Sequence, residues 1–161
     1  MTSLNREKVN SLLKMTKIVE APIDLDKISS VLGFKIIPYP FPDKLSGKVT
    51  IIENQKIIGV NSNHPKTRQR YTIAHEIGHF LNGHEHYQKN YIDDETRYFD
   101  PHFHQEKEAD LFASELLMPK LMIEKDSNYI GLDPKKLAEK YQVSEQAMII
   151  RLTSTGLIRR V

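Results

Sequence analysis

The sequence predicts an α+β protein in which a small, mostly antiparallel sheet packs against a core of helices. Residues rich in β-branched side chains are concentrated in one block, residues 48–60, which indicates short strands. Apolar residues at helical spacing occupy the segments on both sides of that block. Near the C-terminus, two short helical patterns separated by a turn predict a helix-turn-helix-like extension.

The composition is that of an ordinary globular protein. The 161 residues have the length of one compact domain, which we place at residues 1–125, with a C-terminal extension at residues 126–161. Hydrophobic residues make up 39% and charged residues 27% of the chain, and no apolar run has the length needed to span a bilayer. Residues 1–7 carry no signal-peptide pattern, so we expect a cytoplasmic protein without a membrane partner.

Charge and cysteine content exclude several kinds of site. A net charge of +2 is too small to indicate nucleic-acid binding by itself, so nucleic acid is not a favoured partner. The absence of cysteine excludes disulfides and thiolate ligands. Any metal ion must therefore be held by His, Asp or Glu, which favours a catalytic site over a closed structural one.

The N-terminal part of the chain predicts two helices and one strand. Apolar side chains at a helix-like spacing indicate a helix over residues 4–19, and Pro22 interrupts this pattern. A second, short helix is predicted over residues 23–32, and residues 34–37 form a strand. The three prolines within residues 38–42 each remove a backbone donor, so this segment is predicted to be a loop.

Two β-branched runs, residues 48–53 and 56–60, predict a β-hairpin with Asn54 and Gln55 as its turn. Together with the strand at residues 34–37 they would form a three-stranded sheet. We expect this sheet to lie beside the helix that follows it. Its edge could then bind an extended peptide by main-chain hydrogen bonds.

Two longer helices are predicted after the hairpin. A proline preceded by capping residues begins a helix over about residues 65–82. The polar and aromatic stretch at residues 84–99 has no regular period and is predicted to be a loop over a cleft. An Asp-Pro pair then begins the second helix, over about residues 101–118.

The C-terminal extension predicts two short helices within residues 137–152, with Ser144 as the N-cap of the second helix. In a DNA-binding protein this second helix would be the recognition helix. It offers only Glu145, Gln146 and Arg151, with little positive charge. We therefore expect the helical pair to pack on the main domain or to dock a protein partner, with DNA binding as the alternative.

The first of the two longer helices contains the sequence His75-Glu76-Ile77-Gly78-His79, an H-E-x-x-H motif. On a helix His75 and His79 lie one turn apart on the same face, so both imidazoles can hold one metal ion. Glu76 lies beside them, where its carboxylate can take a proton from a metal-bound water that attacks a carbonyl group. Gly78 costs about 1 kcal/mol of helix stability relative to alanine, which indicates that another segment packs closely there. Peptide hydrolysis is the natural use of such a site.

A catalytic zinc site needs a third protein ligand, and the helix at residues 101–118 offers two glutamates. Glu106 shares a face with Asp110 and with two alanines that would let this helix approach the first one closely. Glu108 lies about 200° round the helix from Glu106. We therefore assign Glu106 as the third ligand, with Glu108 as the alternative. Asp110 is placed to accept a hydrogen bond from the free ring nitrogen of a ligating histidine.

The sequence does not single out the group that stabilises the developing oxyanion. A hydroxyl or an imidazole usually has this role, although a surface or packing role is the commoner one for each such residue. The candidates are His84, His86, Tyr87, Tyr91, Tyr98, His102, His104 and Tyr129.

Two segments of the chain resemble the ImmA/IrrE family of metallopeptidases. The first runs from Arg70 to His79 and the second from Glu106 to Pro119, in the order that the family has them. The hairpin before the first segment and the C-terminal helices are also similar to the family. Glu106 and Asp110 fit the E-x-x-x-D spacing of the second motif of gluzincins, which members of the family resemble.

The resemblance implies a zinc endopeptidase with one zinc ion per chain, bound by His75, His79 and Glu106, and with Glu76 as the general base. It also implies a substrate: a helix-turn-helix transcriptional repressor of a phage, a mobile element or a stress regulon, which site-specific cleavage inactivates. The protein would then be an anti-repressor. One alternative is a DNA-binding regulator that uses the C-terminal helices and has a structural or vestigial metal site. Another is a metal-dependent hydrolase of small molecules.

Overall fold

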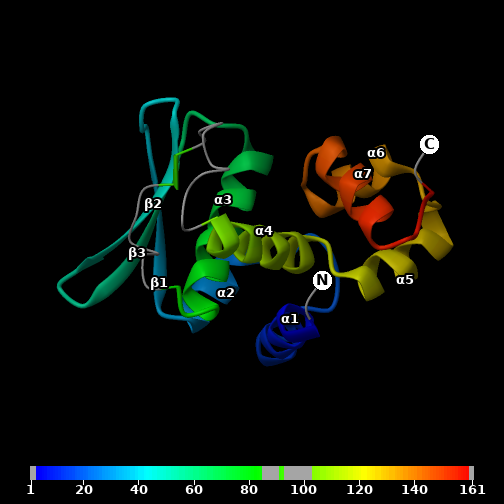
Figure 1. Ribbon diagram of the computed structural model, residues 1–161, viewed down its shortest axis with the longest axis horizontal. Coiled ribbons are helices and arrows are strands. Elements are labelled where there is room, and N and C mark those ends of the chain that lie inside the picture. Colours follow the sequence, from blue (N-terminus) through cyan, green and yellow to red (C-terminus); the bar gives the residue numbers. More distant parts are fainter. Residues whose placement is uncertain (1–2, 85–90, 93–102, 160–161) are drawn as a thin grey trace.

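Seven helices and four strands make up the described part of the chain, residues 3–84, 91–92 and 103–159 of this computed structural model. In chain order they are α1 Ser3–Thr16, α2 Leu25–Val31, β1 Phe34–Tyr39, β2 Leu45–Ile52, β3 Gln55–Asn61, α3 Lys66–Leu81, β4 Tyr91–Ile92, α4 Phe103–Leu117, α5 Lys120–Ile130, α6 Pro134–Tyr141 and α7 Glu145–Ser154. The strands form a sheet on one side of the molecule, with α3 beside it, and α5 to α7 lie at the opposite end (Figure 1). The predicted α+β class is confirmed.

The four strands form one sheet in the order β1-β3-β2-β4. β2 and β3 form the predicted hairpin, but its turn residues are Glu53 and Asn54, one position earlier than expected. Both have a positive φ, 48° and 66°, as a type I′ turn requires. β4 falls within the segment at residues 84–99 that was predicted to be a loop, and the rest of that segment, apart from His84, lies outside the described residues.

The sheet is mixed, which corrects the prediction of a mostly antiparallel sheet. β2 pairs antiparallel with β3 and β4, whereas β1 pairs with β3 in parallel. The parallel pair arises because β2 reverses the chain between β1 and β3, and β1 then lies on the far side of β3. Pro38 and Tyr39 belong to β1 rather than to the predicted loop. Pro38 lacks a backbone donor and is tolerated there because β1 is an edge strand.

α3 and α4 pack closely against each other at Gly78. A Cβ atom at Gly78 would lie 3.0 Å from Cδ1 of Phe112 and 3.1 Å from Cα of Ala109. Ala109 and Ala113 of α4 are fully buried. The close approach expected from the glycine and the two alanines is thereby confirmed. Glycine is needed because the backbone of α4 occupies the space that a side chain would fill.

α1 supports the C-terminal end of α3. The Nζ atom of Lys8 donates hydrogen bonds to the backbone oxygen of Leu81 at 3.0 Å and to Oδ1 of Asn82 at 2.6 Å. A cation at this position satisfies carbonyl groups that the helix leaves unpaired, and it interacts favourably with the negative end of the helix dipole. The end of α3 that follows the H-E-x-x-H motif is therefore held in place.

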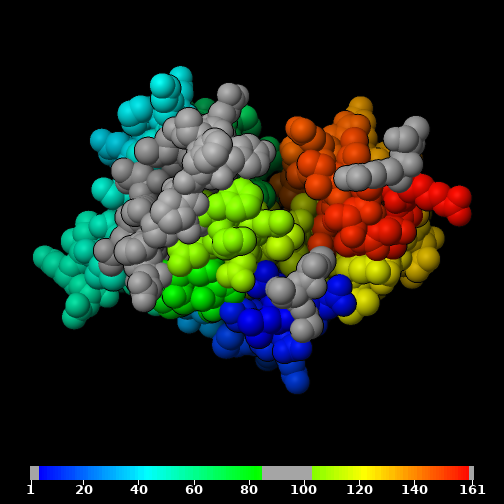
Figure 2. Space-filling model, in the orientation of Figure 1, coloured from blue at the N-terminus to red at the C-terminus, as the bar shows by residue number. Residues whose placement is uncertain are grey.

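The predicted helix-turn-helix pair is formed by α6 and α7, which lie with α5 at one end of the molecule, coloured yellow to red in Figure 2. The Oγ atom of Ser144 accepts a hydrogen bond from the backbone nitrogen of Ala147 at 3.1 Å, as an N-cap does. α5 was not predicted, and Ile123 is its only buried residue. The predicted boundary between residues 125 and 126 falls inside α5. No helix in the described part of the chain is both long and apolar enough to cross a membrane.

Candidate metal centre

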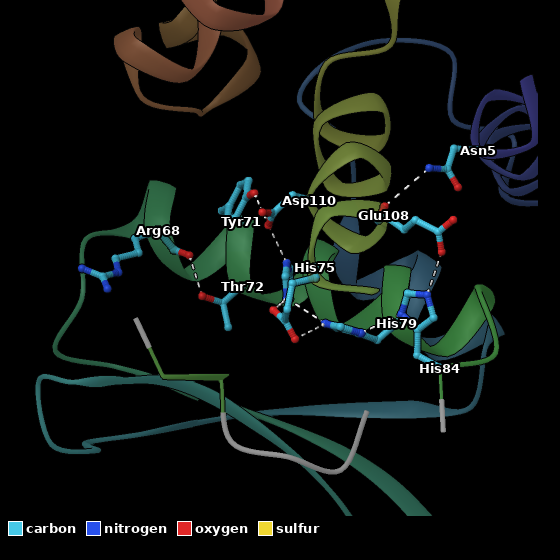
Figure 3. A network of polar contacts seen from close by, with 10 residues as sticks. Asn5, Arg68, Tyr71, Thr72, His75, His79, His84, Glu108 and Asp110 are labelled. Carbon is cyan, nitrogen blue, oxygen red and sulfur yellow. Dashed lines mark hydrogen bonds and ion pairs between the residues drawn. The ribbon is translucent and has the colours of Figure 1, made fainter. Parts of the chain in front are cut away.

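His75, His79 and Glu106 bring three ligand atoms together between α3 and α4, within 4.8 Å of one another. The Nε2 atoms of the two histidines are 2.9 Å apart. Oε2 of Glu106 lies 3.2 Å from Nε2 of His75, and Oε1 lies 3.3 Å from Nε2 of His79. Figure 3 shows both imidazole rings projecting from α3 toward the same point.

The spacing of these atoms fits a zinc ion. Ligands at about 2.0–2.1 Å from zinc, at the corners of a tetrahedron, lie roughly 3.3 Å apart. The two imidazole nitrogens are 2.9 Å apart, and they lie 3.2 and 3.3 Å from Oε2 and Oε1 of Glu106, respectively. Two imidazole nitrogens and one carboxylate oxygen are also the donor set of catalytic zinc sites that keep a fourth position for water. The residues present therefore fit the metal that the motif implies.

Electrostatics also favour a positive charge at this point. Burial disfavours the charged form of His75, but its hydrogen bonds with Asp110 and Glu106 outweigh burial and raise its pKa to about 9. Burial would raise the pKa of Glu106, but hydrogen bonds with His75 and His79 hold that pKa well below its usual range. The carboxylates thus stabilise a positive charge between themselves and the rings, whether it comes from a proton or from a metal ion.

His75 is oriented by a carboxylate on α4. Oδ1 of Asp110 lies 2.8 Å from Nδ1 of His75 and accepts a second hydrogen bond from the hydroxyl of Tyr71 at 2.7 Å. A carboxylate acceptor places the ring proton of His75 on Nδ1, which leaves the Nε2 lone pair directed at Glu106 and His79. Tyr71 in turn fixes the position of Asp110, and all three side chains are shown in Figure 3.

The carboxylate of Glu76 is buried next to His75, with the residue only 1% exposed. Its Oε1 atom has no hydrogen-bond partner among the described residues. Burial raises the pKa of Glu76 to about 8, against the opposing effect of His75. A buried oxygen without a partner costs stability, and such a group calls for an explanation such as a catalytic role. An oxygen of this kind can accept a proton from a substrate or from a water molecule.

His79 makes a different set of contacts from His75. Its Nδ1 atom lies 2.8 Å from Nδ1 of His84, and Nε2 of His84 lies 3.0 Å from Oε2 of Glu108. Burial lowers the pKa of His79. Glu108, the alternative third ligand, therefore contacts His84, whereas Glu106 is the glutamate that contacts both motif histidines.

Several candidates for the oxyanion-stabilising group lie outside the described residues: His86, Tyr87, Tyr98 and His102. Tyr91 is described only as part of the backbone of β4. His104 is exposed in the first turn of α4, and Tyr129 is 82% exposed on α5. The structure does not bring either of these two side chains into the cluster of ligand atoms.

Two residues of the site were not assigned these contacts from the sequence. Tyr71 precedes His75 by four residues, so helical spacing could have placed it on the same face. For His84 the sequence indicated only a place among the candidates for the oxyanion-stabilising group. His84 lies beyond the end of α3, and no periodicity relates it to His79.

An H-E-x-x-H helix and a glutamate from the next long helix, meeting at one point in an α+β fold, define a metallopeptidase-type site. The family model of the IrrE N-terminal-like domain, Peptidase_M78, matches residues 30–153. The chain belongs to this family, which confirms the resemblance drawn from the two motifs. No curated protein sequence matches the chain.

Among solved structures, the chain is similar to a Mycobacterium tuberculosis transcriptional regulator. The two are 13% identical in sequence, with a TM-score of 0.68, over 94% of this chain and 47% of that one. At this level of identity the similarity concerns the fold alone. The chain spans about half the length of that regulator.

Proposed function

We propose that this protein is a zinc-dependent endopeptidase in which His75, His79 and Glu106 hold one zinc ion per chain and Glu76 is the general base. The observation that carries the proposal is the convergence of three ligand atoms within 4.8 Å beside a buried carboxylate oxygen that has no partner among the described residues. Membership of the Peptidase_M78 family supports it.

A zinc ion bound at this site would supply Lewis acidity, which activates water and polarises the carbonyl group of the scissile peptide. Glu76 takes a proton from the water that attacks the carbonyl carbon. It then transfers this proton to the amide nitrogen as the C–N bond breaks, so that the two products are a carboxylic acid, which retains the second proton of the water, and an amine. Asp110 holds the ring of His75 in the tautomer that directs Nε2 at the centre.

We further propose that the substrate is a helix-turn-helix transcriptional repressor, which cleavage inactivates, and that the protein is therefore an anti-repressor. Family membership supports this substrate class. The two isoleucines Ile149 and Ile150, which are exposed on α7, also suit contact with a protein rather than with nucleic acid. A repressor substrate places the activity in the cytoplasm.

A DNA-binding role for α6 and α7, with a structural or vestigial metal site, is the second candidate function. The similarity to a transcriptional regulator favours it. The burial of Arg151 weighs against it, because Arg151 is the basic residue of α7 and is paired with Glu115. α7 is described throughout and so offers no exposed basic side chain to a phosphate group. DNA binding by the purified protein that weakens steeply with salt would support this candidate.

Co-expression with the helix-turn-helix repressor encoded nearest to the gene for this protein tests the proposal. The wild type is compared with Glu76→Gln, and the repressor is analysed by intact-mass spectrometry. We expect two repressor fragments, with masses that sum to the intact repressor plus one water, only with the wild type. An intact repressor with both proteins would remove this substrate. Equal cleavage by both proteins would remove Glu76 as the general base.

A further inference from the structure

We propose that His84 and Glu108 position the ligand His79 through a two-step hydrogen-bond chain and thereby set the metal affinity of the centre. The inference rests on the proposed metal site. The chain runs from Nδ1 of His79 to Nδ1 of His84 at 2.8 Å, and from Nε2 of His84 to Oε2 of Glu108 at 3.0 Å. Figure 3 shows His84 between His79 and the carboxylate of Glu108.

A single placement of protons satisfies both hydrogen bonds when His79 is a metal ligand. A neutral imidazole has one donor nitrogen and one acceptor nitrogen. Nε2 of His79 faces His75 and Glu106 and must present a lone pair to a metal, so the proton of His79 is on Nδ1. Nδ1 of His84 must then accept, and the proton of His84 is on Nε2. The carboxylate of Glu108 accepts that proton and so stabilises the tautomer of His84 that can accept from His79.

The turn that ends α3 places the side chain of His84 against that of His79. The backbone nitrogen of His84 donates to the oxygen of His79 at 3.1 Å, and that of Gly83 donates to the oxygen of Phe80 at 3.2 Å. Gly83 has a φ of 68°. These two bonds, with a left-handed glycine between the helix and His84, form a Schellman motif. The helix end therefore directs the side chain of His84 back onto the histidine that precedes it by five residues.

The Glu108 end of the hydrogen-bond chain is held by α4. His84 is 5% exposed, whereas the side chain of Glu108 is 54% exposed, so the chain leads from the buried centre to the surface. Nδ2 of Asn5 donates to the backbone oxygen of Glu108 at 3.4 Å, which ties this turn of α4 to α1. α4 thus supplies the ligand Glu106 and one supporting carboxylate for each histidine, with Asp110 for His75 and Glu108 for His79.

Zinc affinity tests the inference without any measurement of peptidase activity. The full chain is titrated with zinc in competition with a chromophoric chelator, as wild type, His84→Ala, Glu108→Ala and the double variant. We expect His84→Ala to bind zinc about 10–100-fold more weakly, which is the usual loss when a group that orients a metal ligand is removed. Glu108→Ala should lose less zinc affinity than His84→Ala, because the hydrogen bond between His84 and His79 remains. His104→Ala, which removes an exposed imidazole from the same helix as Glu108, should leave zinc affinity unchanged.

The double variant distinguishes a hydrogen-bond chain through His84 from two independent contributions to zinc affinity. If Glu108 acts only through His84, Glu108→Ala should cost nothing further once His84 is alanine. If Glu108→Ala weakens zinc binding equally in the wild type and in His84→Ala, Glu108 does not act through His84, and the proposed hydrogen-bond chain is wrong. Wild-type affinity in folded His84→Ala would overturn the role of His84. Absence of zinc binding by the wild type would instead overturn the proposed function.

Tautomers give a second readout that a purely structural role would not alter. In long-range ¹H–¹⁵N spectra of the zinc-loaded protein, we expect a proton on Nδ1 of His79 and on Nε2 of His84. Without zinc, when no metal fixes the proton of His79 on Nδ1, Glu108→Ala should leave His84 in a mixture of tautomers. If His84→Ala fails to fold, His84→Leu replaces it, since leucine fills the space but cannot accept a hydrogen bond from His79. A wild-type His84 with its proton on Nδ1 would contradict the inference.

Discussion

Arg151 of α7 and Glu115 of α4 form a buried ion pair, and neither side chain is more than 3% exposed. Nε of Arg151 also donates to the backbone oxygen of Met118 at 2.9 Å. The pair joins the C-terminal helices to α4, the helix that carries Glu106. It also withdraws from solvent the basic side chain that a recognition helix would offer to DNA.

Breaking this pair should strongly destabilise the fold. Arg151→Met leaves the carboxylate of Glu115 buried without a partner, so we expect a loss of about 3–5 kcal/mol in the free energy of unfolding. The double variant Arg151→Met/Glu115→Leu should lose less stability than Arg151→Met alone, because no buried charge is then left unpaired. Urea denaturation measures both. Lys120→Ala, which removes half of an exposed pair with Glu124, is the control and should cost less than about 1 kcal/mol. An equally small cost for Arg151→Met would show that the buried pair is not what holds α7.

Gly78→Ala should separate α3 from α4 and weaken the metal centre. The added methyl group would meet Phe112 and the backbone of Ala109 at 3.0 and 3.1 Å, and the backbone contact cannot be relieved by a change of rotamer. Overpacking of this kind costs about 1–3 kcal/mol, despite the better helix propensity of alanine. We expect lower stability in denaturation and weaker zinc binding in chelator competition.

Gly131→Ala provides the matched control for Gly78→Ala. Its φ of 74° strains an alanine, but nothing lies within 4 Å of the added methyl group. It should cost roughly 1–3 kcal/mol of stability and leave zinc affinity unchanged. If Gly78→Ala also leaves zinc affinity unchanged, close packing of α3 on α4 does not determine the geometry of the centre.

The two glutamates of α4 should differ sharply in their effect on metal content. Glu106 contacts both motif histidines, whereas Glu108 contacts His84. We therefore expect Glu106→Ala to lose stoichiometric zinc in elemental analysis after gel filtration, and Glu108→Ala to retain it with weaker affinity. Full zinc occupancy in Glu106→Ala would move the third ligand to Glu108 or to another residue.

Zinc should stabilise the fold by mass action. At a free zinc concentration of 100 times Kd, the free energy of unfolding should rise by about 2.7 kcal/mol, since the ligand atoms come together only in the folded chain. A chelator should reverse the gain, as measured by thermal unfolding. Glu76→Gln should show the same gain as the wild type, because Glu76 is not among the three proposed ligands. Stabilisation by zinc that survives Glu106→Ala would point to binding elsewhere.

Much of the site could be predicted from the sequence because it depends on helical spacing. His75 and His79 are four residues apart, and so are Glu106 and Asp110, which puts each pair on one face of a helix. Gly78 also indicated close packing before the partner helix was known. These predictions need only the local geometry of the backbone, which neighbouring residues in the chain determine.

The remaining features depend on contacts between segments far apart in the chain. β1 lies parallel to β3, and Ile123 of α5 is buried, because neighbouring elements offer a sheet edge and a surface to pack on. His84 meets Glu108 only after α3 and α4 have docked, and Arg151 is buried only because Glu115 faces it. The sequence by itself thus determined the metal-binding motif and the helices that carry it, since local periodicity suffices. The tertiary structure alone decided which side chains contact the motif histidines and which charge is withdrawn from solvent, because long-range packing brings those partners together.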